Sequence, residues 1–244
     1  HPPLECLFTV DEETGLTGAL KLENTLLTAK KLINIDTEEE GHFCIGCAGG
    51  RNTYASVPFT REAGGGGDFF RLFLSGLKGG HSGINIGEGR GNSIELGARM
   101  LYDLLRSRSD LQLVDIAGGD KHNAIPREFR ATVSVSAREE ELRSWVDRWR
   151  ELLTAELGDI EPGLSLTLER VAGAEGTEPI DRPGTERMVR LLAALPHGVL
   201  RMSRAVEGLV ETSTNLAAVR VEGSELKILT SQRSRRGRGV NDAV

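Results

Sequence analysis

Two short apolar runs, each followed at once by acidic residues, place the strongest constraint on this sequence. Residues 4–10 (LECLFTV) lead into residues 11–13 (DEE), and residues 32–35 (LINI) lead into Asp36. Short apolar runs of this kind are typical of buried strands, and ligand sites of α/β sheets lie at the carboxyl ends of strands. Carboxylates gathered there would repel one another unless cations or solvent offset their charge. The two runs together favour a divalent metal site over two solvated acidic turns.

The composition limits the classes of partner. The 244 residues carry a net charge of -6 and only 5% aromatic side chains, which argues against a surface for nucleic acid, since such surfaces are basic and rich in aromatics. No apolar run approaches the roughly 20 residues of a membrane span, and no signal peptide precedes the first predicted strand. Three cysteines without a secretory signal are typical of a reducing compartment. We expect a cytoplasmic protein that binds neither nucleic acid nor a membrane.

The remainder of the sequence predicts an α+β domain. Residues 139–157 form the clearest amphipathic helix, and Trp145 and Trp149 lie on its apolar stripe, where core packing is expected. Asn92 is suited to cap another helix. We expect helices at 92–106, 139–157 and 185–195, a short helix within 15–27, and strands at 52–60, 69–77, 111–116, 129–137, 164–171, 216–221 and 226–231. This order predicts a largely antiparallel sheet with helices packed on one face.

A glycine-rich segment at 48–50 is the expected domain boundary. We assign residues 1–49 to an α/β unit that carries the acidic runs, residues 50–235 to the α+β domain, and residues 236–244 to an irregular tail. The sequence begins almost directly with a predicted central strand, whereas chain termini are usually peripheral. We therefore expect it to be part of a longer protein.

Five motifs occur in order along the sequence. They are DEETG (11–15), with Asp36 following 23 residues after Glu13, then GCAGG (46–50), GGHSG (79–83), HNAIPRE (122–128) and GLVETS (208–213). Together they resemble the aminoacyl-histidine dipeptidases, or Xaa-His dipeptidases, of the M20 metallopeptidase family. The likeness extends to about residue 234. It implies an α/β fold class in which part of an M20 zinc-peptidase catalytic domain is followed by an α+β lid or dimerisation domain.

The resemblance also implies roles for the acidic residues. Glu12 matches the general base of the family, Glu13 the adjacent metal ligand, and Asp36 a ligand of the second metal. Two zinc ions, with manganese or cobalt as alternatives, would lie about 3.5–4 Å apart, lower the pKa of a shared water and polarise the scissile carbonyl. Glu12 would then take a proton from that water and return it to the leaving amine.

Three residues of the α+β domain match lid residues of the family. The resemblance implies that His81 reaches across a dimer to the partner's active site and helps stabilise the oxyanion. It implies that Asn123 and Arg233 hold the substrate, through an amide at the scissile carbonyl and a guanidinium at the C-terminal carboxylate. Taken alone, a histidine in a glycine-rich loop is more often solvated, and Arg233 adjoins the basic tail.

The expected function is therefore metal-dependent hydrolysis of dipeptides of the Xaa-His or β-alanyl-histidine type, by a homodimer formed through the lid. A His-x-Asp motif, a bridging Asp and a C-terminal His of the family have no counterpart in this sequence, so we expect the chain by itself to be inactive. Two alternatives stay open. One is another M20 peptidase or an N-acyl amino-acid deacylase, and the other is a non-catalytic dimerisation or binding module.

Overall fold

A computed structural model of the chain describes residues 3–12, 16–35, 40–41, 46–62, 66–171, 178–236 and 239. The chain divides into two compact units, His1–Cys47 and Ala48–Val244. Among the described residues, no helix has the length and apolar character needed to cross a membrane.

The smaller unit contains one short helix, α2 (Thr17–Leu20), within the region where a helix is predicted. The predicted strands at 4–10 and 32–35 are wrong, because the described residues there form no strand. Their apolar side chains are exposed, with Phe8 90% and Ile35 89% accessible. A strand needs a neighbour that takes up its backbone hydrogen bonds and a layer that covers its apolar face. The described part of this unit supplies neither.

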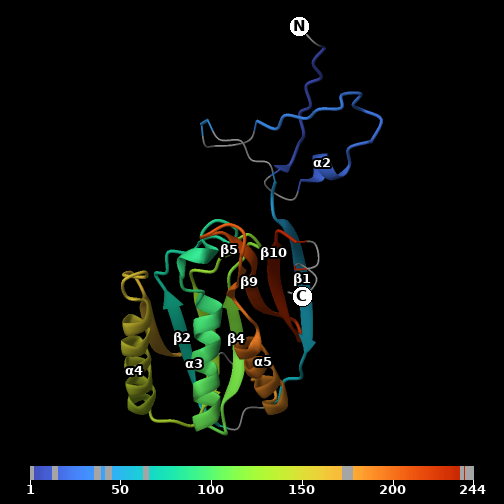
Figure 1. Cartoon of the computed structure of the whole chain (residues 1–244). Helices are drawn as coiled ribbons and strands as arrows, with labels where there is room; N and C mark the ends of the chain where they lie inside the picture. The colour runs from blue at the N-terminus through green and yellow to red at the C-terminus, as the bar shows by residue number, and fades with distance from the viewer. Residues whose placement is uncertain are drawn as a thin grey trace. The chain divides into compact units, whose positions relative to one another are not determined.

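The larger unit is a mixed α+β domain built on one antiparallel sheet (Figure 1). Its helices are α3 (Ser93–Ser107), α4 (Glu139–Leu157) and α5 (Arg182–Ala194), with a 3-10 turn η1 (Ile86–Glu88). Its strands are β1 (Gly49–Pro58), β2 (Asp68–Ser75), β4 (Gln112–Gly118), β6 (Phe129–Val135), β7 (Ser165–Val171), β8 (Gly198–Met202), β9 (Val210–Glu222) and β10 (Glu225–Ser234). A separate two-stranded ribbon pairs β3 (Gly80–His81) with β5 (Ala124–Ile125).

The sheet runs in the order β1-β10-β9-β4-β6-β2-β7, and β8 also pairs with β9. The three helices lie on the same face of this sheet (Figure 1), as the sequence predicts. Apolar side chains from both layers meet between them and form the core, including Ile94 and Met100 of α3 and Phe70 and Phe129 of the sheet. Burial of these side chains is the main source of stability for such a layered domain.

Asn92 joins the start of α3 to the sheet. Its Oδ1 accepts hydrogen bonds from the backbone N–H groups of Ile94 (3.0 Å) and Glu95 (3.2 Å), which confirms the predicted N-cap. Its Nδ2 donates to the carbonyl of Leu216 in β9 (2.9 Å) and to Nδ1 of His197 (3.0 Å). Burial lowers the pKa of His197 to about 4, so this ring is neutral and can accept the amide proton. Both polar atoms of the buried Asn92 side chain are therefore hydrogen-bonded.

Asp103 joins α3 to α4. One of its carboxylate oxygens, Oδ2, accepts from the indole N–H groups of Trp145 (2.8 Å) and Trp149 (2.9 Å) and from Arg148 (3.1 Å). The two partly buried indoles also pack against the hydrophobic core, as predicted. The pair of rings therefore fixes the position of α4 beside α3.

The junction of β4 with β9, which we call the β4–β9 seam, is the shortest pairing of long strands in the described sheet. It consists of the register pairs Ala117↔Arg220 and Gly118↔Val219, whereas the first part of β9 pairs with β8 instead. Helices α3 and α5 pack against each other on the face of the sheet that carries the helices (Figure 1). The seam joins the part of the domain made by β2, β4, β6 and β7 to the part made by β1, β9 and β10.

Gly119 is required at the seam for two reasons. Its φ of 62° lies in the left-handed region, and a Cβ added to it would lie 2.0 Å from the carbonyl oxygen of Ala217 in β9. A backbone oxygen cannot move aside as a flexible side chain can. The close approach of the two backbones therefore depends on glycine.

Replacing Gly119 by Ala should destabilise the larger unit more than the same change at Gly223. Gly223 also has a positive φ, of 58°, but a Cβ there would meet nothing within 4 Å. Gly223→Ala should cost about 1 kcal/mol for the left-handed backbone alone, whereas Gly119→Ala should cost about 1–3 kcal/mol more for the clash. Urea unfolding of both variants measures the difference. Equal losses would mean that the seam does not bring the two backbones this close.

Candidate functional site

Two loops are joined at one end of the sheet and bring together residues far apart in the sequence. The segment 76–92 links β2 to α3, and its short strand β3 pairs with β5, so that His81 lies opposite Ala124. The backbone N–H of Ser82 donates to the carbonyl of Asn123 (2.8 Å). The predicted site residues His81 and Asn123 are therefore neighbours, held by backbone hydrogen bonds between their loops.

The ring of His81 is held in one tautomer. Its Nδ1 accepts from the backbone N–H groups of Gly83 (3.3 Å) and Ile84 (3.2 Å), so the proton of the neutral ring is on Nε2. Burial lowers the pKa of His81, and electrostatic interactions with Arg233 and then with His122 lower it further. Near neutral pH the half-buried ring is therefore a neutral hydrogen-bond donor at Nε2.

Arg233 comes from the opposite half of the domain and reaches the same place. It lies in β10, in register with Gly50 of β1 and Ser213 of β9. A Cβ added to Gly83 would lie 3.1 Å from Nη1 of Arg233 and 3.0 Å from Cε1 of His81. Gly83 therefore leaves the space in which the guanidinium and the imidazole approach each other. The structure brings all three predicted lid residues together.

Three buried polar atoms in this region lack a hydrogen-bond partner. They are Oγ of Ser82, Oδ1 of Asn215 and Nε of Arg233, and they are the unpartnered buried side-chain atoms found in the part of the chain that the structure describes. The amide Nδ2 of Asn215 donates to the carbonyls of Ala124 (2.7 Å) and His122 (3.4 Å), which ties β9 to the Asn123 loop. Folded proteins rarely leave buried polar atoms unpaired. Their concentration here indicates a site for a polar ligand.

Ser82 and Asn215 are functional candidates that our sequence reasoning missed. Ser82 directly follows His81 within GGHSG, so its place in that motif was an available signal. Asn215 ends the polar run ETSTN (211–215), and these side chains are buried within β9. The sequence pattern predicts a strand only from 216 onward, because a run of polar residues does not have the pattern of a buried strand. The buried polar residues 211–215 in the first part of β9 therefore indicate where the candidate site lies.

Arg233 is a desolvated cation. Burial lowers the pKa of its guanidinium, and no carboxylate of the described residues forms an ion pair with it. A half-buried positive charge without a counter-ion is costly unless a ligand supplies one. The chemical class that matches a guanidinium beside a neutral imidazole donor is a carboxylate or another oxyanion.

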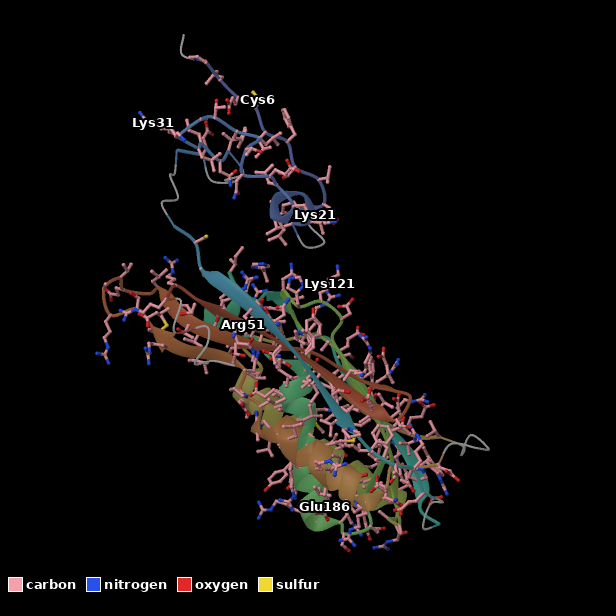
Figure 2. All side chains as sticks on the ribbon, turned by 90° about the vertical axis from the view of Figure 1, so that its right-hand side faces the viewer. Cys6, Lys21, Lys31, Arg51, Lys121 and Glu186 are labelled. Atoms are coloured by element: carbon pink, nitrogen blue, oxygen red, sulfur yellow. The ribbon has the colours of Figure 1, made fainter. Side chains whose placement is uncertain are left out.

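A groove of about 590 Å³ lies beside β5 and is lined by residues that include Asp120, Lys121 and Arg127. Lys121 projects from the loop end of the larger unit in Figure 2. Neither His81 nor Arg233 lines this groove. Its charges are of both signs, and none of the residues with unpartnered buried atoms lines it. We therefore place the candidate site at His81 and not in the groove.

Known proteins are similar to this chain in both sequence and fold. Residues 74–161 match the peptidase dimerisation domain of the M20 family. The cytosol non-specific dipeptidase of Escherichia coli (strain K12) is 41% identical over 230 residues, which are 93% of this chain and 47% of the relative. The crystal structure of aminoacylhistidine dipeptidase from Vibrio alginolyticus superposes with a TM-score of 0.85 at 39% identity, over 96% of this chain and 48% of that chain. Over nearly its whole length, the chain is therefore similar in sequence and fold to dipeptidases, and part of it matches a domain of the M20 family.

The chain spans about half the length of the M20 relatives that it matches. Of the residues predicted to form the M20 metal centre, Glu12 is described and exposed, whereas Glu13 and Asp36 lie outside the described residues. The backbone turns next to Glu12, where Asp11 has a φ of 63°. Within the described ranges, no group of three or more His, Cys, Asp or Glu side chains could hold a metal ion. The metal ligands therefore stay predictions from the sequence.

Removing the charge of Arg233 should raise the pKa of His81. Arg233→Met takes away a positive charge that disfavours the imidazolium, so the pKa should rise toward the ordinary value near 6.5 without reaching it, because the ring stays partly buried. Imidazole chemical shifts followed by NMR across pH 4–8 measure the change. The control is Arg235→Met, which removes an exposed charge two residues away. An unchanged pKa in Arg233→Met would contradict the proximity of the two groups.

Proposed function

We propose that the complete protein to which this chain belongs hydrolyses dipeptides, Xaa-His dipeptides among them. The observation that carries the proposal is the convergence of the His81 ring with the unpartnered buried atoms of Ser82, Asn215 and Arg233 at one site. Both relatives reported above are named as dipeptidases. A dipeptide would supply hydrogen-bond partners for the unpaired groups of this site, since it has a carboxylate, a peptide N–H and a peptide carbonyl within a small molecule.

Each side chain has a role that its chemistry supports. The guanidinium of Arg233 would bind the C-terminal carboxylate of the substrate. The Nε2–H of His81 would donate to the scissile carbonyl oxygen as it gains negative charge, and donors fixed in advance lower the barrier most. Asn123 and the unpartnered atoms of Ser82 and Asn215 would orient the peptide by hydrogen bonds. Together these groups hold the substrate but do not attack it.

The hydrolytic step itself requires groups of the smaller unit. We propose Glu12 as the general base, which takes a proton from the attacking water and delivers it to the leaving amine. We propose Glu13 and Asp36 as ligands of two divalent ions, zinc first and manganese or cobalt as alternatives, since carboxylate donors suit each of these ions. Such ions, when bound, supply Lewis acidity to the carbonyl and to the water.

We further propose a cytoplasmic homodimer that forms through the lid, because residues 74–161 match a peptidase dimerisation domain. Arg233 and His81 adjoin within a single chain, so both serve the same active site, whether that site is their own or the partner's. The chain by itself is proposed to be inactive, and a purified sample loaded with zinc should not hydrolyse carnosine. Hydrolysis by this sample would contradict that part of the proposal.

Substrate profiles of the complete protein separate the dipeptidase proposal from its alternatives. Hydrolysis of dipeptides with a free C-terminal carboxylate supports the proposal. Preference for N-acyl amino acids or tripeptides would favour another M20 activity, and absence of both zinc and hydrolysis would favour a binding module.

The neighbouring glutamates should have separable effects in the complete protein. Glu12→Gln should keep both metal ions and lower kcat by about 10²–10⁴-fold, the usual range for a general base. Glu13→Ala should instead lower the metal content, because it removes a ligand. Metal analysis alongside kcat measurements checks both variants. A Glu12→Gln protein without metal, combined with a fully loaded Glu13→Ala protein, would reverse the assignment.

Mixing two inactive variants tests whether His81 acts in the partner's site. His81→Ala should lower kcat by roughly 10²–10³-fold, as loss of an oxyanion donor does. In a mixed dimer with Glu12→Gln, one site would have its own Glu12 and would receive His81 from the other chain, so activity should return in part. If His81 serves its own chain, every site in the mixed dimer lacks one group and no activity returns.

A further inference from the structure

Both ends of the loop that carries His81 are attached to one buried carboxylate. Glu161 is 1% exposed. Its Oε2 accepts from the backbone N–H of Lys78 (2.7 Å), and its Oε1 accepts from the backbone N–H of Gly91 (2.9 Å). Lys78 and Gly91 are the points where the loop leaves β2 and approaches α3. A single side chain therefore closes the segment 78–91, which we call the His81 loop.

Glu161 is itself held firmly in the turn that follows α4. Its backbone N–H donates to the carbonyl of Leu157 (2.6 Å), and its carbonyl accepts from the N–H of Leu164 (3.0 Å). The same turn packs tightly against the end of β2, since a Cβ added to Gly76 would lie 1.9 Å from the carbonyl oxygen of Gly163. The carboxylate thus reaches the His81 loop from a rigid base.

Inside the loop, a chain of hydrogen bonds leads toward His81. Arg90 donates from Nη1 to the carbonyl of Gly79 (2.5 Å) and from Nε to Glu88 (2.7 Å). Glu88 also accepts from Nδ2 of Asn85 (2.7 Å), and Oδ1 of Asn85 accepts from the backbone N–H of His81 (2.9 Å). The two attached ends and this internal network together restrict where the imidazole can lie.

We propose that Glu161 is a positioning residue for His81. By accepting hydrogen bonds from both ends of the loop, the carboxylate offsets the conformational entropy that the loop loses on closing, and it holds the ring beside Arg233. It also keeps the N–H groups of Gly83 and Ile84 aimed at Nδ1, which fixes the proton on Nε2. The catalytic meaning of this role rests on the proposed function, whereas the role itself concerns the ring and can be tested on this chain alone.

The chemistry of the contact requires a carboxylate. Each oxygen of Glu161 faces a backbone donor, and a carboxylate offers acceptors at both positions. Glutamine has nearly the same shape but one oxygen only, so in Glu161→Gln an NH2 group would face an N–H group and one end of the loop would be released. The variant therefore removes one attachment while it preserves the packing.

The test compares Glu161→Gln with Glu156→Gln in the chain as it stands. Glu156 is a matched control, because it lies in the last turn of α4, shortly before the turn that holds Glu161, and also accepts two N–H donors, both from Arg99, which lies outside the His81 loop. Imidazole NMR reports the tautomer and the pKa of His81, and amide hydrogen exchange reports opening at Gly83 and Ile84.

In Glu161→Gln, we expect exchange at the amides of Gly83 and Ile84 to be about tenfold faster or more. We also expect a mixture of ring tautomers and a pKa closer to 6.5, because burial and the electrostatic interactions with Arg233 and His122 act less on a displaced ring.

Two results would overturn the proposal. One is an unchanged His81 spectrum in Glu161→Gln while exchange at Lys78 and Gly91 accelerates, since the carboxylate would then hold the loop ends without positioning the ring. The other is an equal change in the Glu156→Gln control. Either result leaves the dipeptidase proposal intact, because that proposal is tested by substrate hydrolysis in the complete protein.

Amide hydrogen exchange on the unaltered chain tests the same proposal even if Glu161→Gln does not fold. If Glu161 positions the ring, the amides of Gly83 and Ile84 should open together with those of Lys78 and Gly91, with similar free energies of opening. Exchange at Gly83 and Ile84 that is about a hundredfold faster than at the two attached amides would show that the ring moves independently, and the proposal would fail.

Discussion

The larger unit depends on the burial of one face of its antiparallel sheet beneath α3, α4 and α5. A sheet face lined with Phe70, Phe129 and similar side chains gains stability only when an apolar layer covers it. The polar contacts then decide how the layers fit together. Asn92 attaches the start of α3 to β9, and Asp103 attaches α3 to the two indoles of α4. With the layers fixed, the connecting loops gather at one end of the sheet, and the candidate site lies there.

The sequence predicted the helices and most strands of this unit well, for identifiable physical reasons. The amphipathic period of residues 139–157 coincides with α4, and Asn92 caps α3 as its side-chain chemistry predicts. Strand β8 was missed, because its short run GVLRM between turns has no alternating pattern. The strands predicted at 4–10 and 32–35 are wrong, since apolar character alone does not make a strand where the described residues offer it no partner.

The candidate site could be predicted from the sequence in part. His81, Asn123 and Arg233 were expected because whole motifs resemble a known family, and the structure brings these residues together. Ser82 and Asn215 could not be found in this way, because what distinguishes them is a buried atom without a partner, and burial is a property of the fold. The role of Glu161 could not be predicted from the sequence for the same reason, since it depends on two hydrogen bonds with the backbone of a distant loop.

The β4–β9 seam has a consequence for the size of the ligand. His81 belongs to the half of the domain that contains β2 and β4, whereas Arg233 belongs to the half that contains β9 and β10. The span between imidazole and guanidinium therefore depends on the joints between the halves, which include the two residue pairs of the seam and the hydrogen bonds from Asn215 of β9 to the Asn123 loop. A small sliding of one half along the other would change which ligand length fits between the two groups. The range of ligand lengths that the candidate site could hold would in this sense depend on how the two halves are joined, at residues outside the site.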